Sequence, residues 1–174
     1  MTTGLEEYWD KAVTFDRWLD QVEANRDLWR GIYDRAAVEP GVVDRVDGPF
    51  RLLVLAEDWC GDAVNTIPWL ARLAEASHAL ELRILRRDEN PALMASHTTG
   101  GSSSIPVVMV LDRAFHELGW WGPRPEELQA WVLEEGLALT KQERYMHVRA
   151  WYARDRGRTT LAEVLALIER EAAR

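Results

Sequence analysis

Apolar residues recur at intervals of three and four along the first 35 residues, the spacing of one face of a helix. The pattern predicts two helices, one beginning after Thr14 and one after Asn25, because both residue types are favoured N-caps. Residues 40–49 contain two prolines and two glycines, so we interpret them as a connection.

The pattern then changes to that of strands. Residues 50–56 (FRLLVLA) form a continuous apolar run, which is typical of a central strand covered on both faces. Residues 80–85 alternate as a second strand, and residues 107–112 and 114–120 are interpreted as a hairpin.

Helical spacing reappears between and after these strands. Residues 63–77 predict a helix with Pro68 inside it, where a proline removes a backbone hydrogen bond and kinks the helix. Thr160 and Glu163 stand in capping-box spacing at the start of the last predicted helix. The other predicted helices cover residues 91–97, 126–135, 141–154 and 161–173. This order of elements builds a small mixed sheet with helices on both faces.

The composition suits a folded chain with a sizeable core, since 47% of the 174 residues are hydrophobic. The formal net charge of −8 opposes attraction to phosphate backbones and anionic lipid, so nucleic acid and membranes are not expected as partners. No apolar run approaches the roughly 18 residues of a membrane span, and acids stand near the start where a secretory signal is basic. We therefore expect a cytoplasmic protein.

Cys60 is the only cysteine, which excludes an internal disulfide and a zinc site built mainly from thiolates. The histidines show no metal-ligand spacing, so we expect no metal site. These histidines are His78, His97, His116 and His147.

Four segments resemble a known family. They read AEDWCGDA after the first strand, RRDENP after the second, SIPVVMVLD at the third and ELGWWGPRPEEL at the end of the unit. Together they resemble a thioredoxin-fold protein, in particular the bacterial thioredoxin-like family marked by a W-C-G-D motif. The resemblance covers about residues 48–136. It implies an α/β thioredoxin fold with a central mixed sheet of about four strands flanked by helices. Residues 1–47 would then be a helical N-terminal extension, and residues 137–174 a helical C-terminal extension packed on the same domain.

Cys60 is the candidate catalytic residue, standing where a strand passes into a helix. The thiolate is the reactive form of cysteine, and a helix N-terminus stabilises it through its dipole and free amides. We expect the thiol to be exposed or half-exposed. Its pKa would fall from about 8.5 toward the range of roughly 3.5 to 7.5 at activated sites, whereas Glu57, Asp58 and Asp62 would raise it. The distances to these carboxylates decide the balance.

Two departures from the thioredoxin pattern bear on activity. Ala63 occupies the place of the second cysteine, which resolves the mixed disulfide in thioredoxins, so turnover requires an outside thiol such as glutathione or another low-molecular-weight thiol. Val54 occupies the place of the buried aspartate that relays a proton in thioredoxins.

The resemblance also implies a set of substrate-binding residues. Pro106 would follow a cis peptide bond, and the backbone of Ile105 would pair with an extended substrate beside the cysteine. Trp59 would form an apolar wall next to the thiol, and Gly61 would permit a close turn. Asp62 completes the candidate set.

Three functions remain open. The first is thiol–disulfide exchange at Cys60, without a bound cofactor and resolved by an outside thiol; peroxide sensing through a sulfenic acid is a variant. The second is a non-catalytic module that docks peptides at Ile105 and Pro106. The third is a glutaredoxin-like iron–sulfur carrier, which fits Cys60 but not Asp62.

The expected partners are protein or small-molecule disulfides and thiols, or a second copy of the chain. Residues 141–158 concentrate arginines in an otherwise acidic protein. They form a solvated helix face, or they bind an acidic partner or the carboxylates of a small thiol.

Overall fold

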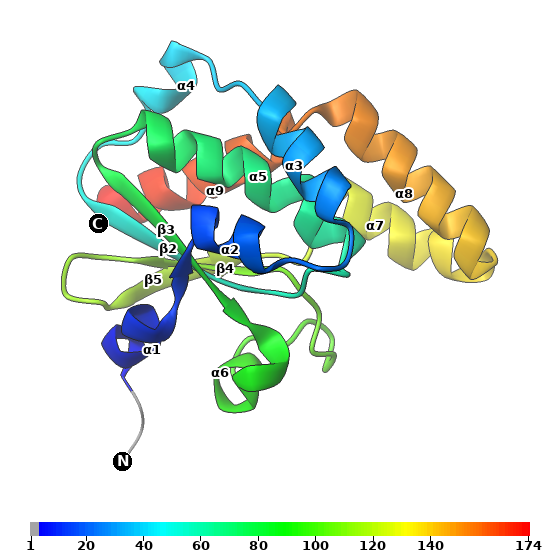
Figure 1. Cartoon of the computed structure of the whole chain (residues 1–174), viewed down its shortest axis with the longest axis horizontal. Helices are drawn as coiled ribbons and strands as arrows, with labels where there is room; N and C mark the ends of the chain where they lie inside the picture. Colours follow the sequence, from blue (N-terminus) through cyan, green and yellow to red (C-terminus); the bar gives the residue numbers. More distant parts are fainter. Residues whose placement is uncertain (1–3) are drawn as a thin grey trace.

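The computed structural model describes residues 4–174 and contains a five-stranded mixed sheet in the order β1-β3-β2-β4-β5 (Figure 1). The strands are β1 (Val13–Thr14), β2 (Phe50–Ala56), β3 (Leu80–Arg86), β4 (Val107–Leu111) and β5 (Glu117–Trp121). β2 pairs in parallel with β3 and antiparallel with β4. The predicted α/β class is confirmed.

Helices cover both faces of the sheet. In Figure 1, α5 and α9 lie on one side of it, with α3 packed on α5, while α1 and α6 lie on the other side. The helices are α1 (Leu5–Lys11), α2 (Phe15–Gln21), α3 (Arg26–Arg35), α4 (Pro40–Val43), α5 (Gly61–Ala76), α6 (Pro91–Ala95), α7 (Glu126–Glu134), α8 (Lys141–Asp155) and α9 (Arg158–Ala172), with short 3-10 helices η1 (Arg87–Glu89) and η2 (Gly136–Ala138). Within residues 4–174, none of them combines the length and apolar character needed to cross a membrane.

The apolar run of β2 forms the centre of the core. Its residues from Leu52 to Ala56 are fully buried, as expected for a strand paired on both sides and covered on both faces. Val54 stands opposite Ile84 of β3 and Val108 of β4. Val54, which stands where thioredoxins have the aspartate that relays a proton, is therefore part of an apolar layer.

The sheet has five strands instead of about four, because Val13 and Thr14 pair antiparallel with Ile84 and Arg83 of β3. A strand of two residues is too short to show an alternating pattern. The connection predicted over residues 40–49 is also partly helical, since α4 begins at its first proline, a residue suited to the first turn of a helix.

The two predicted N-caps behave differently. The hydroxyl of Thr14 accepts a hydrogen bond from the backbone N–H of Arg17 at 3.4 Å and caps α2. Asn25 precedes α3 in a left-handed conformation, without a side-chain capping bond. Its side-chain amide instead donates to the carbonyl of Asp58 at 3.3 Å, in the loop before α5.

The capping box predicted at Thr160 and Glu163 is wrong. α9 begins two residues before Thr160, so both residues lie inside the helix. The Glu163 carboxylate accepts a hydrogen bond from the Trp121 indole at 2.6 Å and ties α9 to β5. A capping box forms at the start of α8, between Thr140 and Glu143.

The C-terminal helices pack in two places. α9 contributes apolar side chains to the main core, whereas α7 and α8 share a smaller cluster of their own. That cluster contains Leu128, Val132, Val148 and Tyr152. In Figure 1, α7 and α8 extend beyond the N-terminal end of α5. The domain limits at residues 48 and 136 stay predictions.

Candidate functional site

Cys60 is the N-cap of α5, at the junction that follows β2. Its sulfur accepts a hydrogen bond from the backbone N–H of Ala63 at 3.4 Å, and its thiol donates to the carbonyl oxygen of Ile105 at 3.5 Å. The junction lies here because the apolar run of β2 ends at Ala56 and helical geometry begins at Gly61. The structure therefore brings together two segments of the predicted site that are 45 residues apart.

The expectation of an exposed or half-exposed thiol is wrong, because Cys60 is only 7% exposed. Burial raises the pKa of Cys60 to about 11, and the negative charge of Asp62 adds to the increase. Backbone hydrogen bonds and the Arg124 guanidinium lower it, but burial outweighs them. The pKa does not fall as it does at activated cysteines, so the thiol is protonated at neutral pH.

Asp62 belongs to a buried network beneath the thiol. One oxygen of its carboxylate accepts hydrogen bonds from the Tyr152 hydroxyl at 2.7 Å and from Arg124 Nε at 3.1 Å. Arg124 Nη2 lies 3.0 Å from the other oxygen. Burial raises the pKa of Asp62, while both partners oppose that rise. The network joins α8 and the segment after β5 to the start of α5.

Neither partner of Asp62 was among the predicted site residues. Arg124 lies in the GPRP segment that carries the family resemblance, and Tyr152 lies in the arginine-rich stretch. No spacing in the sequence connects Asp62 with a tyrosine 90 residues away. Only packing of α8 on α5 reveals this pair.

The other two carboxylates of the motif have structural roles. Glu57 lies 3.1 Å from Arg86 Nη1 of β3, in an ion pair in which the carboxylate is buried and the arginine is partly exposed. The Asp58 carboxylate accepts the backbone N–H of Glu23 at 2.9 Å, and its backbone carbonyl accepts the Trp29 indole N–H at 2.9 Å. These bonds hold the N-terminal helices against the loop before α5. Neither carboxylate is among the groups that shift the pKa of the thiol.

Two cis peptide bonds lie in neighbouring segments, one directly before β4 and one directly after its paired strand β5. One precedes Pro106 and the other joins Gly122 to Pro123. Gly122 has a φ of +134°, and a Cβ there would lie 2.1 Å from the carbonyl oxygen of Pro106. Only glycine fits this close approach. Ile105 and Pro123 line the cavity beside the thiol, whereas Pro106 is buried behind it.

We call this cavity the Cys60 pocket; its volume is about 460 Å³. Its lining residues come from α3 and α5 with the residues just before them, from η1 and α8, and from the loops before β4 and after β5. They are Asn25, Leu28, Trp59, Cys60, Gly61, Asp62, Val64, Asn65, Arg87, Ser102, Ser103, Ser104, Ile105, Pro123, Arg124, Arg144, Tyr145, Val148 and Arg149. Five of the six predicted site residues therefore lie together, and Pro106 stands behind them.

Trp59 and Gly61 differ in how they fit their predicted roles. Trp59 is 52% exposed and forms part of the pocket wall, with the Arg87 guanidinium 5.1 Å from its ring centroid. Gly61 does not need its conformational freedom for a close turn. Its φ is not positive, and an added Cβ would meet no atom within 4 Å.

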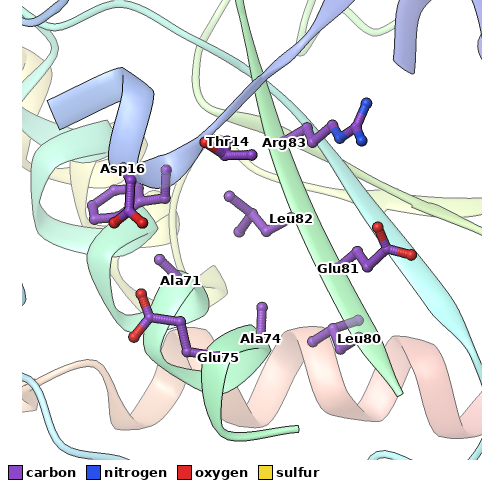
Figure 2. Close-up of a pocket in the computed structure, with 10 residues that line it drawn as sticks. Thr14, Asp16, Ala71, Ala74, Glu75, Leu80, Glu81, Leu82 and Arg83 are labelled. Atoms are coloured by element: carbon purple, nitrogen blue, oxygen red, sulfur yellow. The ribbon is translucent and has the colours of Figure 1, made fainter. Parts of the chain in front are cut away.

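Another pocket, of about 260 Å³, lies between the start of α2, α5 and β3 (Figure 2). Ala71, Ala74 and Leu82 point into it, and the carboxylates of Asp16 and Glu75 lie on the helical side. Its lining contains no residue of the W-C-G-D motif. Among residues 4–174, no group of three or more His, Cys, Asp or Glu side chains is placed to hold a metal ion.

Comparison with known proteins supports the fold. A family model described as Thioredoxin matches residues 12–145. Two solved structures align over nearly the whole chain, each at 21% identity: a protein of unknown function from Pseudomonas aeruginosa and an HIV epitope scaffold. For the first, the TM-score is 0.78 and the alignment covers 97% of this chain and 98% of the other chain. For the second, the TM-score is 0.76 and the alignment covers 96% of this chain and 98% of the other chain. No curated protein matches the chain. At this identity the structures establish the fold alone, but the family match spans most of the chain, which therefore belongs to the thioredoxin family.

Proposed function

We propose that the protein performs thiol–disulfide exchange through Cys60 and that an outside low-molecular-weight thiol resolves the product. The observation that carries this proposal is the position of the only sulfhydryl group, at the N-terminus of α5 and in the wall of a pocket. A disulfide seated in the pocket would lie against that sulfur.

The exchange conserves atoms and electrons. The Cys60 thiolate attacks one sulfur of a disulfide, forming a mixed disulfide and expelling the other half as a thiolate, which takes up the proton that Cys60 lost. An outside thiolate then attacks the substrate sulfur of the mixed disulfide and expels Cys60, which is protonated again. One disulfide is consumed and one is formed, so no further oxidant is needed. Ala63 cannot perform the second step from within the chain.

The raised pKa of Cys60 determines how such exchange would proceed. A small thiolate fraction slows attack at neutral pH, and a thiol of high pKa is also a poor leaving group. Both effects oppose rapid turnover: the first slows formation of the mixed disulfide, and the second slows its resolution and so prolongs its life. The proposed activity is therefore the slow formation of mixed disulfides at Cys60, rather than the fast reduction of protein disulfides.

A second candidate is a docking module without turnover, and the burial of Cys60 favours it. A buried, protonated cysteine behaves as a small apolar residue. In that case the pocket binds its ligand without any covalent step.

Mass spectrometry of the intact protein separates the two candidates. The native protein is incubated with 2-hydroxyethyl disulfide, which is small and uncharged, at a series of pH values. Exchange predicts a single adduct that a small thiol removes, and a rate that rises about tenfold per pH unit below the pKa. Cys60→Ser serves as the control and forms no adduct. An adduct that appears only in denaturant would overturn the exchange proposal and leave the docking module.

A further inference from the structure

Arginines gather around the Cys60 pocket although the protein has a net charge of −8. Four line the pocket itself: Arg87, Arg124, Arg144 and Arg149. An adjacent cavity of about 530 Å³, which we call the α8 groove, lies between α3, α5 and α8 and adds Arg35 and Arg156. The two cavities share Arg149, so they form one continuous cationic surface.

Little negative charge offsets these arginines. Among the described residues that line the two cavities, Asp62 is the only one with a carboxylate, and this carboxylate forms an ion pair with Arg124 Nη2 at 3.0 Å. Arg87 pairs with the exposed Asp88 at 3.0 Å. Within residues 4–174, the other four arginines form no ion pair within 4.0 Å; they are Arg35, Arg144, Arg149 and Arg156. Such a concave surface attracts anions.

Carboxylates are among the anions that this surface suits. A guanidinium presents a planar fork of donors that matches the two oxygens of a carboxylate. Arg149 and its neighbour Val148 lie in the same turn of α8, and both line the Cys60 pocket. A ligand that reaches Arg144 therefore occupies the cavity whose wall contains Cys60, and a ligand at Arg149 lies where this cavity meets the α8 groove.

We propose that the Cys60 pocket binds a low-molecular-weight thiol that carries carboxylates, as its disulfide. This inference rests on the proposed exchange, because the sulfur of the ligand must meet Cys60 while its carboxylates bind Arg144 and Arg149 of α8. The volume of about 460 Å³ lies in the range of pockets for small molecules, roughly 300 to 1,000 Å³. The continuation into the α8 groove leaves room for the second half of the disulfide.

Binding is tested first without chemistry, on Cys60→Ser, by titration calorimetry with three disulfides of different charge. Oxidised glutathione is anionic, 2-hydroxyethyl disulfide is neutral and cystamine is cationic. We expect oxidised glutathione alone to bind, with an affinity that falls as salt is added. Equal binding of all three, or of none, would overturn the inference.

A pair of variants on α8 tests where the anion binds. Arg149→Gln, in the Cys60→Ser background, should weaken the binding of oxidised glutathione about tenfold, the loss expected for one charge-assisted contact. Arg154→Gln is the matched control, because Arg154 is also an exposed arginine of α8 but lines neither cavity. Equal effects of the two variants would show that only the overall charge matters and would refute the site.

The two proposals fail in different ways. If the wild-type protein forms an adduct with the neutral disulfide but shows no preference for the anionic one, exchange stands and the carboxylate site falls. If Cys60→Ser binds oxidised glutathione through Arg149 but the wild type forms no adduct, the site stands and exchange falls. If an acidic peptide without sulfur binds as tightly as oxidised glutathione, the pocket recognises acidic peptides and the small-thiol inference is wrong.

Discussion

Replacing Asp62 with asparagine removes the one charge that the structure identifies as raising the pKa of Cys60. The amide side chain would keep the size of the carboxylate and one oxygen that accepts hydrogen bonds from Tyr152 and Arg124. The positive charge of Arg124, which lowers the pKa of the thiol, would remain nearby and lose its partner. Both changes favour the thiolate.

The direction of the effect follows from the causes of the raised pKa. The pKa of Cys60 rises from 9.0 to about 11, with burial as the largest cause and Asp62 as the second. A charge at such close range shifts a pKa by roughly one unit or more, so we expect the loss of the Asp62 charge to lower the pKa of Cys60 by about one unit, which corresponds to about 1.4 kcal/mol. The variant should have about ten times more thiolate than the wild type at any pH well below both values.

The assay is the pH dependence of alkylation of Cys60 by iodoacetamide on the folded protein. We expect Asp62→Asn to shift the midpoint of the profile down by about one unit. Glu57→Gln is the control, because it removes a buried carboxylate three residues from the cysteine that does not act on its pKa. Circular dichroism verifies that both variants are folded.

Two results would refute this reasoning. A wild-type midpoint near or below neutral pH would show that burial does not control the thiol. Equal shifts in Asp62→Asn and Glu57→Gln would show that overall charge, rather than the network beneath Cys60, determines its pKa.

Two further predictions concern stability. Folding raises the pKa of Cys60, so the contribution of Cys60 to the free energy of unfolding is fully present below the unfolded-state pKa and is lost as pH rises from about 9 toward 11. In urea unfolding experiments over this pH range, the wild type should lose about 1.4 kcal/mol of stability per pH unit relative to Cys60→Ala. A wild type that parallels Cys60→Ala over this range would contradict the burial effect. Gly122→Ala places a Cβ 2.1 Å from the carbonyl oxygen of Pro106 at a positive φ, so thermal unfolding should show a loss of more than about 1 kcal/mol. Gly61→Ala meets no atom within 4 Å and should be neutral or slightly stabilising, so similar costs in the two variants would refute the role given to Gly122.

Local sequence patterns accounted for most of the fold. The run in β2 matched its strand end to end, because a strand buried on both faces must be apolar throughout. α5, α8 and the β4–β5 hairpin lie within a few residues of their predicted limits, because α5 and the hairpin present apolar residues to the main core and α8 presents them to the smaller cluster with α7. Short elements such as β1 and α4 were missed, since two to four residues do not establish a period.

The site was predicted less completely than the fold. The W-C-G-D segment and Ile105 were found because they stand at the ends of recognisable strands and resemble a family motif. Pro123, Arg124 and Tyr152 were missed, because their roles depend on how the segment after β5 and α8 fold back onto α5.

The sequence by itself determined the α/β class, the position of the only sulfur at the start of a helix and the absence of a resolving cysteine, because these follow from local pattern and residue identity. Only the tertiary structure decided that Cys60 is buried and protonated, that Asp62 is held by Arg124 and Tyr152, and that Arg144 and Arg149 of α8 line the pocket. Burial and charge are sums over neighbours that are distant along the chain, and folding alone brings those neighbours together.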